Sequence, residues 1–125
     1  MNYQNAYPPR SITLGESLLV FDAETPAPPQ ASAQAALASA FDNTAPSISV
    51  EISFSGDPGA FEIDIQDADT DADKFYQTIP AGGVISAVSA NFTARTELVP
   101  IKGRFVRLKL VTRTNAVALT AKISR

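Results

Sequence analysis

The chain contains no cysteine, no histidine and no tryptophan. The absence of cysteine excludes thiol nucleophiles, thiolate metal sites and redox switching. The absence of histidine excludes Ser-His triads, His-zinc sites and pH switches that depend on the side chain titrating near neutral pH. Because the residues that most often perform chemistry are missing, the composition favours a binding or assembly module over an enzyme. We expect no cofactor.

Long apolar runs are also missing. The first ten residues, MNYQNAYPPR, are polar and lack the apolar stretch that a signal peptide or a membrane span requires. We therefore expect no membrane partner. At 125 residues the chain has the length of one domain. A chain of this size buries roughly two thirds of its unfolded surface, so it needs no disulfide or metal ion to fold.

Short segments of alternating apolar and polar residues fill the chain from Ser47 onward, and Val84–Phe92 is the least regular of them. Alternation with a period of two places every second side chain on one face of a strand. Closely spaced strands of this kind are typical of sandwiches. We predict an all-β fold, an antiparallel β-sandwich or jelly roll. The predicted core positions in the first two strands are Ile48, Val50, Ile52, Phe54, Phe61, Ile63 and Ile65.

Two β-hairpins are predicted from the turn residues between strands. The first joins Ser47–Ser55 to Ala60–Gln66 through Gly56–Gly59, where glycine supplies a positive φ and proline fixes the corner. The second joins Arg104–Thr112 to Ala116–Ser124. In this second pair, alternation points Val106, Leu108, Leu110, Val117, Leu119, Ala121 and Ile123 inward.

The N-terminal residues 1–10 combine asparagine, glutamine, tyrosine and proline, a mixture that neither fills a core nor continues a helix. We predict an extended arm, of the kind that is often ordered only against a neighbour. Residues 11–125 then form a single β-sandwich domain. Its first strand, Ser11–Phe21, is expected to be bent or bulged at Gly15.

Residues 25–46 form an alanine- and proline-rich connection within that domain. The alanine-rich part, 31–41, is compatible with one short helix anchored by Leu37 and Phe41, which are spaced i, i+4. A helix this short is marginal unless it packs. An alanine-proline linker is the alternative.

Four aspartates stand at every second position of one loop, namely Asp67, Asp69, Asp71 and Asp73. Oxygen-rich runs of this kind can bind calcium. The match to a helix-loop-helix calcium loop fails, because Ala72 stands where that loop has its turn glycine and Thr78 where it has a bidentate glutamate. These four residues are at most weak metal candidates, and a solvated hairpin tip explains them.

Charge is distributed unevenly although the net charge is only -3. Twelve of the thirteen acids lie between Glu16 and Asp73, and no acid follows Glu97. Acidic and basic strands can neutralise each other across a sheet, and Glu62 and Asp64 are expected to meet cations in this way rather than to act as a catalytic pair. An acidic chain with one aromatic in its basic run also argues against a nucleic-acid partner.

The strand Gly103-Arg104-Phe105-Val106-Arg107-Leu108 near the C-terminus carries a resemblance. Residues 47–79 contribute a strand, a Gly-Pro turn, a second strand, an acidic loop and then Phe75-Tyr76. Together these features resemble the small jelly-roll and discoidin-like sandwich modules in structural proteins of tailed bacteriophages. Those modules share a G-R-[FY]-V-R-[LV] strand followed by one last strand. The resemblance covers residues 47–125, about two thirds of the chain, and is one of strand pattern more than of signature.

The resemblance, with the arm, implies a capsid decoration (cement) protein that binds the major capsid protein or other virion proteins, on the capsid surface of a virion assembled in the host cytoplasm. Decoration proteins of this kind are commonly trimers, so a homotrimer is expected. The alternative is a carbohydrate-binding module of a tail or fibre, using the acidic loop and Tyr76. The expected partner-binding residues are Tyr3, Tyr7, Arg10, Arg104, Arg107 and Lys109.

Overall fold

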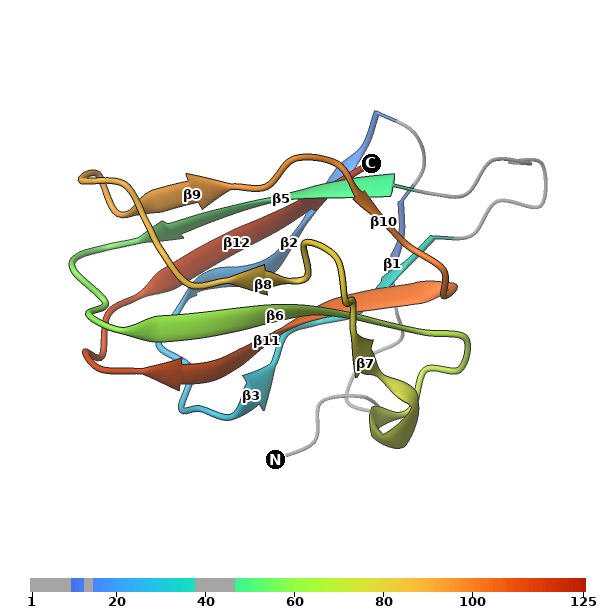
Figure 1. The fold of residues 1–125 in the computed structure, drawn as a ribbon, viewed down its shortest axis with the longest axis horizontal. Helices are drawn as coiled ribbons and strands as arrows, with labels where there is room; N and C mark the ends of the chain where they lie inside the picture. The colour runs from blue at the N-terminus through green and yellow to red at the C-terminus, as the bar shows by residue number, and fades with distance from the viewer. Residues whose placement is uncertain (1–9, 13–14, 38–46) are drawn as a thin grey trace.

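The computed structural model describes residues 10–12, 15–37 and 47–125, and these form two packed β-sheets (Figure 1). The predicted all-β sandwich is confirmed. The only helical element among the described residues is one turn of 3-10 helix, η1 (Asp73–Phe75). None of the described residues forms a helix long and apolar enough to cross a membrane.

The larger sheet has seven strands in the order β1-β4-β11-β6-β7, with β3 also pairing β11 and β8 also pairing β6. Its strands are β1 (Arg10–Ser11), β3 (Gln30–Ala31), β4 (Ala35–Ala36), β6 (Phe61–Ala68), β7 (Gln77–Thr78), β8 (Val84–Ile85) and β11 (Phe105–Arg113).

The smaller sheet has five strands in the order β10-β5-β12-β2, with β9 also pairing β5. Its strands are β2 (Ser17–Glu24), β5 (Ser47–Phe54), β9 (Thr93–Arg95), β10 (Val99–Pro100) and β12 (Leu119–Ser124). In Figure 1 this sheet forms the upper layer, with β5, β9 and β12 above β6 and β11.

The core lies between the two sheets and uses the positions that alternation predicts. The inward side chains of β5 and β6 are at most 5% exposed, and those of β11 and β12 are at most 1% exposed. Because one face of each long strand supplies the core, the polar residues between these positions point to the two outer faces of the sandwich.

Both predicted hairpins are wrong, although their strands exist. β5 and β6 belong to different sheets, and so do β11 and β12. The ladders instead join β6 to β11 and β5 to β12. Each predicted turn therefore carries the chain across the sandwich from one sheet to the other, and the two crossings lie side by side at one end (Figure 1).

Hydrogen bonds between the two crossing segments explain why the chain turns there. Ser55 N donates to Ala118 O at 2.9 Å, and Ala118 N donates back to Ser55 Oγ at 3.0 Å. Asn115 donates from its backbone N to Pro58 O at 2.9 Å and from Nδ2 to Asp57 O at 3.0 Å. The turn residues satisfy one another instead of closing two separate hairpins.

The short helix predicted over residues 31–41 is wrong for the part that the structure describes. β3 and β4 pair with β11 instead, and Ser32 N donates to Leu108 O at 2.7 Å between them. Ala35 is fully buried. Intrinsic helix propensity is a weak preference, and pairing with β11 supplies this segment with backbone partners that a short surface helix would lack. Residues 38–41 lie outside the described part.

The segment Ser11–Phe21, predicted to be one bent strand, is divided between the two sheets. β1 pairs in parallel with β4 in the larger sheet, whereas β2 begins at Ser17 in the smaller one. Between them Gly15 has a φ of +84° and donates its N–H to Arg125 O at 2.9 Å. A positive φ suits glycine, so the predicted bend is a crossing. Similarly, only residues 84–85 of the expected strand Val84–Phe92 form a strand.

Candidate functional site

Arg107, on β11, is the most buried charged residue that the structure describes. Alternation points its side chain to the outer face of the larger sheet, but only 2% of it is exposed. Its Nη2 lies 2.9 Å from Asp73 Oδ1, and its Nε donates to Gln66 Oε1 at 2.9 Å. Its Nη1 is buried and has no hydrogen-bond partner among the described residues. Arg107, expected to bind a partner, is therefore held by residues of its own fold and is not exposed for such a contact.

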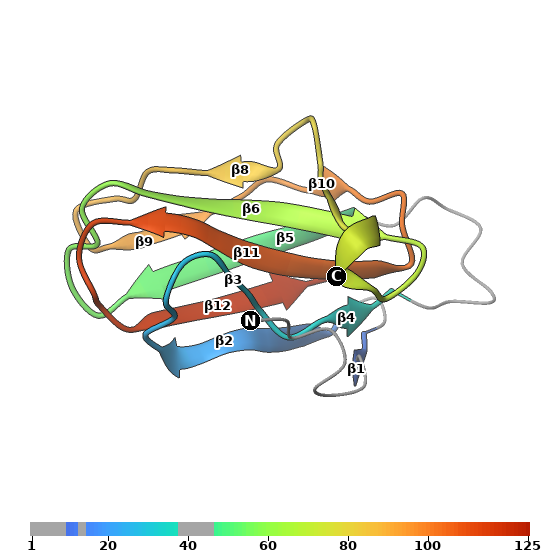
Figure 2. The ribbon, with the colours of Figure 1, turned by 90° about the horizontal axis from the view of Figure 1, so that it is seen from below.

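Tyr76 covers this arginine. The guanidinium carbon lies 4.1 Å from the centre of the Tyr76 ring, within cation–π range. The Tyr76 hydroxyl donates to Asp71 Oδ1 at 2.7 Å. Burial, followed by this bond to Asp71 and by the charge of Asp71, raises the pKa of Tyr76 above its ordinary value. In Figure 2, which views the molecule from below, η1 lies over β6 and β11.

Residues 69–76, which follow β6 and fold back over β6 and β11, form a covering segment (Figure 2). Most of the acidic run belongs to this segment rather than to a free hairpin tip. Asp67 Oδ2 accepts the backbone N–H groups of Lys102 and Gly103, both at 2.9 Å, while Asp71 and Asp73 bind Tyr76 and Arg107. Among the described residues, no three carboxylates are grouped so that they could hold a metal ion. Since Tyr76 is only 7% exposed, its ring is not available to stack on a sugar.

Asp64 extends the network along β6. Its Oδ2 accepts the Thr78 hydroxyl at 2.9 Å, and Thr78 is also 3.4 Å from Gln66 Nε2. A hydrogen bond with Asp64 and the charge of Asp64 raise the pKa of Glu62, its neighbour on the same strand face. Asp64 also lies opposite Lys109 in the β6–β11 ladder. Acidic β6 is thus paired with basic β11, but only Asp64 of the expected two acids lies opposite a cation, because Glu62 lies opposite Thr112.

The other predicted partner-binding residues lie in different places. Arg104 is exposed beside β11, and Lys109 is partly exposed on it. Arg10 begins β1, at the edge of the same sheet. Tyr3 and Tyr7 lie outside the described residues. The structure therefore brings Arg10, Arg104 and Lys109 to one sheet, and leaves their role in binding a prediction.

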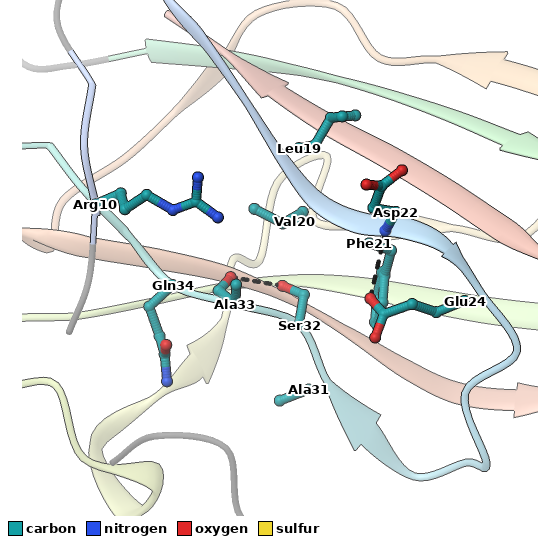
Figure 3. A pocket seen from close by; sticks show the side chains of 10 residues that line it. All are labelled: Arg10, Leu19, Val20, Phe21, Asp22, Glu24, Ala31, Ser32, Ala33 and Gln34. Atoms are coloured by element: carbon teal, nitrogen blue, oxygen red, sulfur yellow. Dashed lines mark hydrogen bonds between the residues drawn. The ribbon is translucent and has the colours of Figure 1, made fainter. Parts of the chain in front are cut away.

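Arg10 borders a hollow of about 230 Å³ between the facing edges of the two sheets (Figure 3). Its side chain points toward Val20 on β2, whereas the buried Gln34 points away from β2. Ala33 N donates to Val20 O at 3.3 Å, which ties the two edges together. The hollow lies where an edge of one sheet meets an edge of the other, with β2 on one side and residues 31–34 on the other.

A second hollow, of about 420 Å³, lies on the outer face of the smaller sheet. Its floor carries the row Arg95–Glu51–Lys122, from β9, β5 and β12. Glu51 Oε1 lies 3.4 Å from Arg95 Nη2 and 3.7 Å from Lys122 Nζ. This row is not among the residues predicted from the sequence. Its signal was the outward set of β5, which contains only serine and glutamate.

No protein-family model matches this chain, and neither does any curated protein or any solved structure.

Proposed function

We propose that the chain is a non-enzymatic structural component of a tailed-phage particle, a decoration protein on the outer surface of the capsid. One observation supports the proposal most. β1, which follows the sequence-predicted arm directly, is an edge strand of the same sheet that carries Arg104 and Lys109. An arm and exposed cations on or beside one sheet can bind one partner surface together.

The proposed mechanism depends on contacts between protein surfaces. The arm, with Tyr3 and Tyr7 as anchors, adds backbone hydrogen bonds to a neighbouring sheet edge or crosses capsid subunits. Arg104 and Lys109 meet acidic side chains of the shell. Arg107 has no part in this contact, because Asp73 and Gln66 hold it inside the fold. Three copies on a local three-fold axis complete the proposed assembly.

The polar residues of the larger sheet support a scaffold rather than a catalytic role. The side chains that could work as an acid pair, Glu62 and Asp64, lie on one strand face beside Lys109 rather than facing each other across a cleft. Retaining and inverting glycosidases both need two carboxyl groups on opposite sides of a scissile bond.

Co-sedimentation with empty heads of the encoding phage tests the proposal. The parent protein is expected to sediment with the heads, and deletion of residues 1–9, which leaves β1 intact, is expected to abolish sedimentation without unfolding the sandwich. Arg104→Glu is expected to weaken it. Arg95→Glu makes the same charge change on the other sheet and serves as the control. Folded parent protein that stays in the supernatant contradicts the capsid role.

A further inference from the structure

The outer face of the smaller sheet presents charged and hydroxyl groups in ordered rows. In the β-ladders, Arg95 and Lys122 lie on either side of Glu51, and Thr93 and Thr120 lie on either side of Ser53. All six side chains line the hollow of about 420 Å³. The face therefore carries a charged row next to a hydroxyl row. The two rows are separated by the two-residue repeat of the strands.

The charged row is exposed and incompletely satisfied. The side chains of Arg95, Glu51 and Lys122 are 72%, 42% and 38% exposed. Both cations approach the same carboxylate oxygen of Glu51, at 3.4 and 3.7 Å, which is longer than a good charge-assisted hydrogen bond. Two cations against one acid leave the row with a positive balance and with donors directed at solvent.

The hydroxyl row explains why the face is hollow. Ser53 and the two threonines are short, so the charged side chains of the neighbouring row stand above them. Ser89, whose Oγ lies 3.2 Å from Thr93 Oγ1, forms one wall. Leu19, 44% exposed on β2, forms the opposite end. The hollow thus combines hydroxyls, cations and one carboxylate with three aliphatic residues, of which Leu19 is exposed.

We propose that this face binds an acidic glycan, an oligosaccharide whose sugars carry carboxylates. A sugar carboxylate fits the positive balance of Arg95 and Lys122. Sugar hydroxyls can donate to Glu51, exchange hydrogen bonds with Ser53 and accept from the hydroxyl of Thr120, whose Oγ1 already accepts the Ala23 N–H at 3.1 Å. The C–H face of a sugar ring can lie against Leu19. None of the described residues lining the hollow is aromatic, so the sugar is held by polar groups and Leu19 rather than by ring stacking. The same absence disfavours single-stranded nucleic acid, whose bases need stacking platforms.

This inference does not rest on the proposed capsid role. Of the candidate capsid contacts, Arg10 and Lys109 belong to the larger sheet and Arg104 lies beside it, whereas the glycan face belongs to the smaller sheet. A molecule attached through one outer face leaves the other face directed away from the attachment surface. Either activity can therefore fail in a test while the other stands.

Calorimetric titration with defined oligosaccharides of galacturonate, glucuronate and sialic acid tests the inference. The parent protein is expected to bind at least one of these, and the methyl ester of that same oligosaccharide is expected to bind at least about tenfold more weakly, since about 1.4 kcal/mol of charge contact is lost. The double variant Arg95→Gln, Lys122→Gln is expected to lose a similar factor. These residues are exposed, and a thermal melt confirms that the variant folds.

Arg104→Gln is the matched control, because it removes one cation from the other sheet and is expected to leave binding within about twofold. Four results overturn the inference. They are no binding to any of the three acidic oligosaccharides, equal binding of the methyl ester, an equal loss in Arg104→Gln, and equally tight binding of an aspartate oligomer, which carries carboxylates without a sugar.

Discussion

The two outer faces of the sandwich use similar polar residues in opposite ways. On the larger sheet, the segment that follows β6 folds back over the strands, and Arg107 beneath it is 2% exposed. On the smaller sheet nothing in the described chain covers the strands so closely, and Arg95 is 72% exposed. Both arginines lie on strands, point outward and face an acid.

The difference shows that exposure, rather than residue type, decides whether a charged row stabilises a fold or remains available. Arg107 has Asp73, Gln66 and the Tyr76 ring around it. Removing a partner from such a group leaves polar atoms buried and unpaired, which is costly. Among the described residues Arg95 has one long ion pair, 3.4 Å from Glu51, and its side chain is otherwise exposed. Exposed ion pairs of that kind contribute little to stability.

Replacing the two arginines gives the largest expected contrast. Arg107→Ala is expected to lower the free energy of unfolding by about 3 kcal/mol, because Gln66 and the Tyr76 ring lose their buried partner. Arg95→Ala, the matched control, is expected to change it by less than about 0.5 kcal/mol. Urea denaturation of both variants measures the difference. Equal changes in unfolding free energy would mean that the arginines of the two faces contribute equally to stability, which contradicts the contrast.

Replacing Asp67 tests whether the carboxylates on the larger-sheet side of the sandwich contribute to the stability of the fold. Asp67→Ala is expected to cost about 2 kcal/mol, because the N–H groups of Lys102 and Gly103 lose a charged acceptor. Asp69→Ala, an exposed aspartate of the same loop, is expected to stay within about 0.5 kcal/mol of the parent. A loss in Asp69→Ala as large as in Asp67→Ala would show that net charge, rather than the amide contacts, matters.

Tyr76→Phe is expected to cost about 1 kcal/mol near neutral pH, since it removes only the bond to Asp71. The variant also has a pH signature. Because burial and Asp71 raise the pKa of Tyr76 in the folded state, the unfolded state loses this proton first. Stability from this group is present below the ordinary tyrosine pKa of about 10 and declines above it.

The measurement for Tyr76 is the free energy of unfolding between neutral pH and about pH 11. The parent is expected to lose more stability above about pH 10 than Tyr76→Phe does. Parallel curves for the two proteins would show that the Tyr76 hydroxyl is solvated rather than held under the covering segment.

Glu51→Gln gives the smallest expected effect. Its side chain is 42% exposed and its two ion pairs are long, so the change in unfolding free energy is expected to stay below about 0.5 kcal/mol. Thermal or urea denaturation checks this. A loss of several kcal/mol would mean that the charged row stabilises the smaller sheet, which would remove the contrast between the faces.

The core could be predicted from the sequence, whereas the pairing of strands could not. Alternation identifies the inward residues of β5, β6, β11 and β12, because that pattern depends only on which face of each strand is buried. A tight hairpin and a crossing between two sheets both preserve the pattern. The bonds that decide between them, such as Asn115 to Pro58 and Asp57, join turns distant in sequence.

The same limit applies to the two outer faces. Alternation places Arg107 outward correctly, but its burial depends on Tyr76 and Asp73. The regular spacing of aspartates in their loop does not predict that the loop folds back over β11. The row on the smaller sheet joins Glu51 to Arg95 and Lys122 from two other strands. It becomes visible only once strand order and register are known.

An amide chemical-shift titration with the best-binding acidic oligosaccharide tests the division between the two faces most directly, because one spectrum reports on both sheets. The expected perturbations fall on Glu51–Ser53, Thr93–Arg95 and Thr120–Lys122, while Gln66, Tyr76 and Arg107 remain unchanged. Perturbations centred on the covering segment and β11, with none on β5, β9 and β12, would contradict the account.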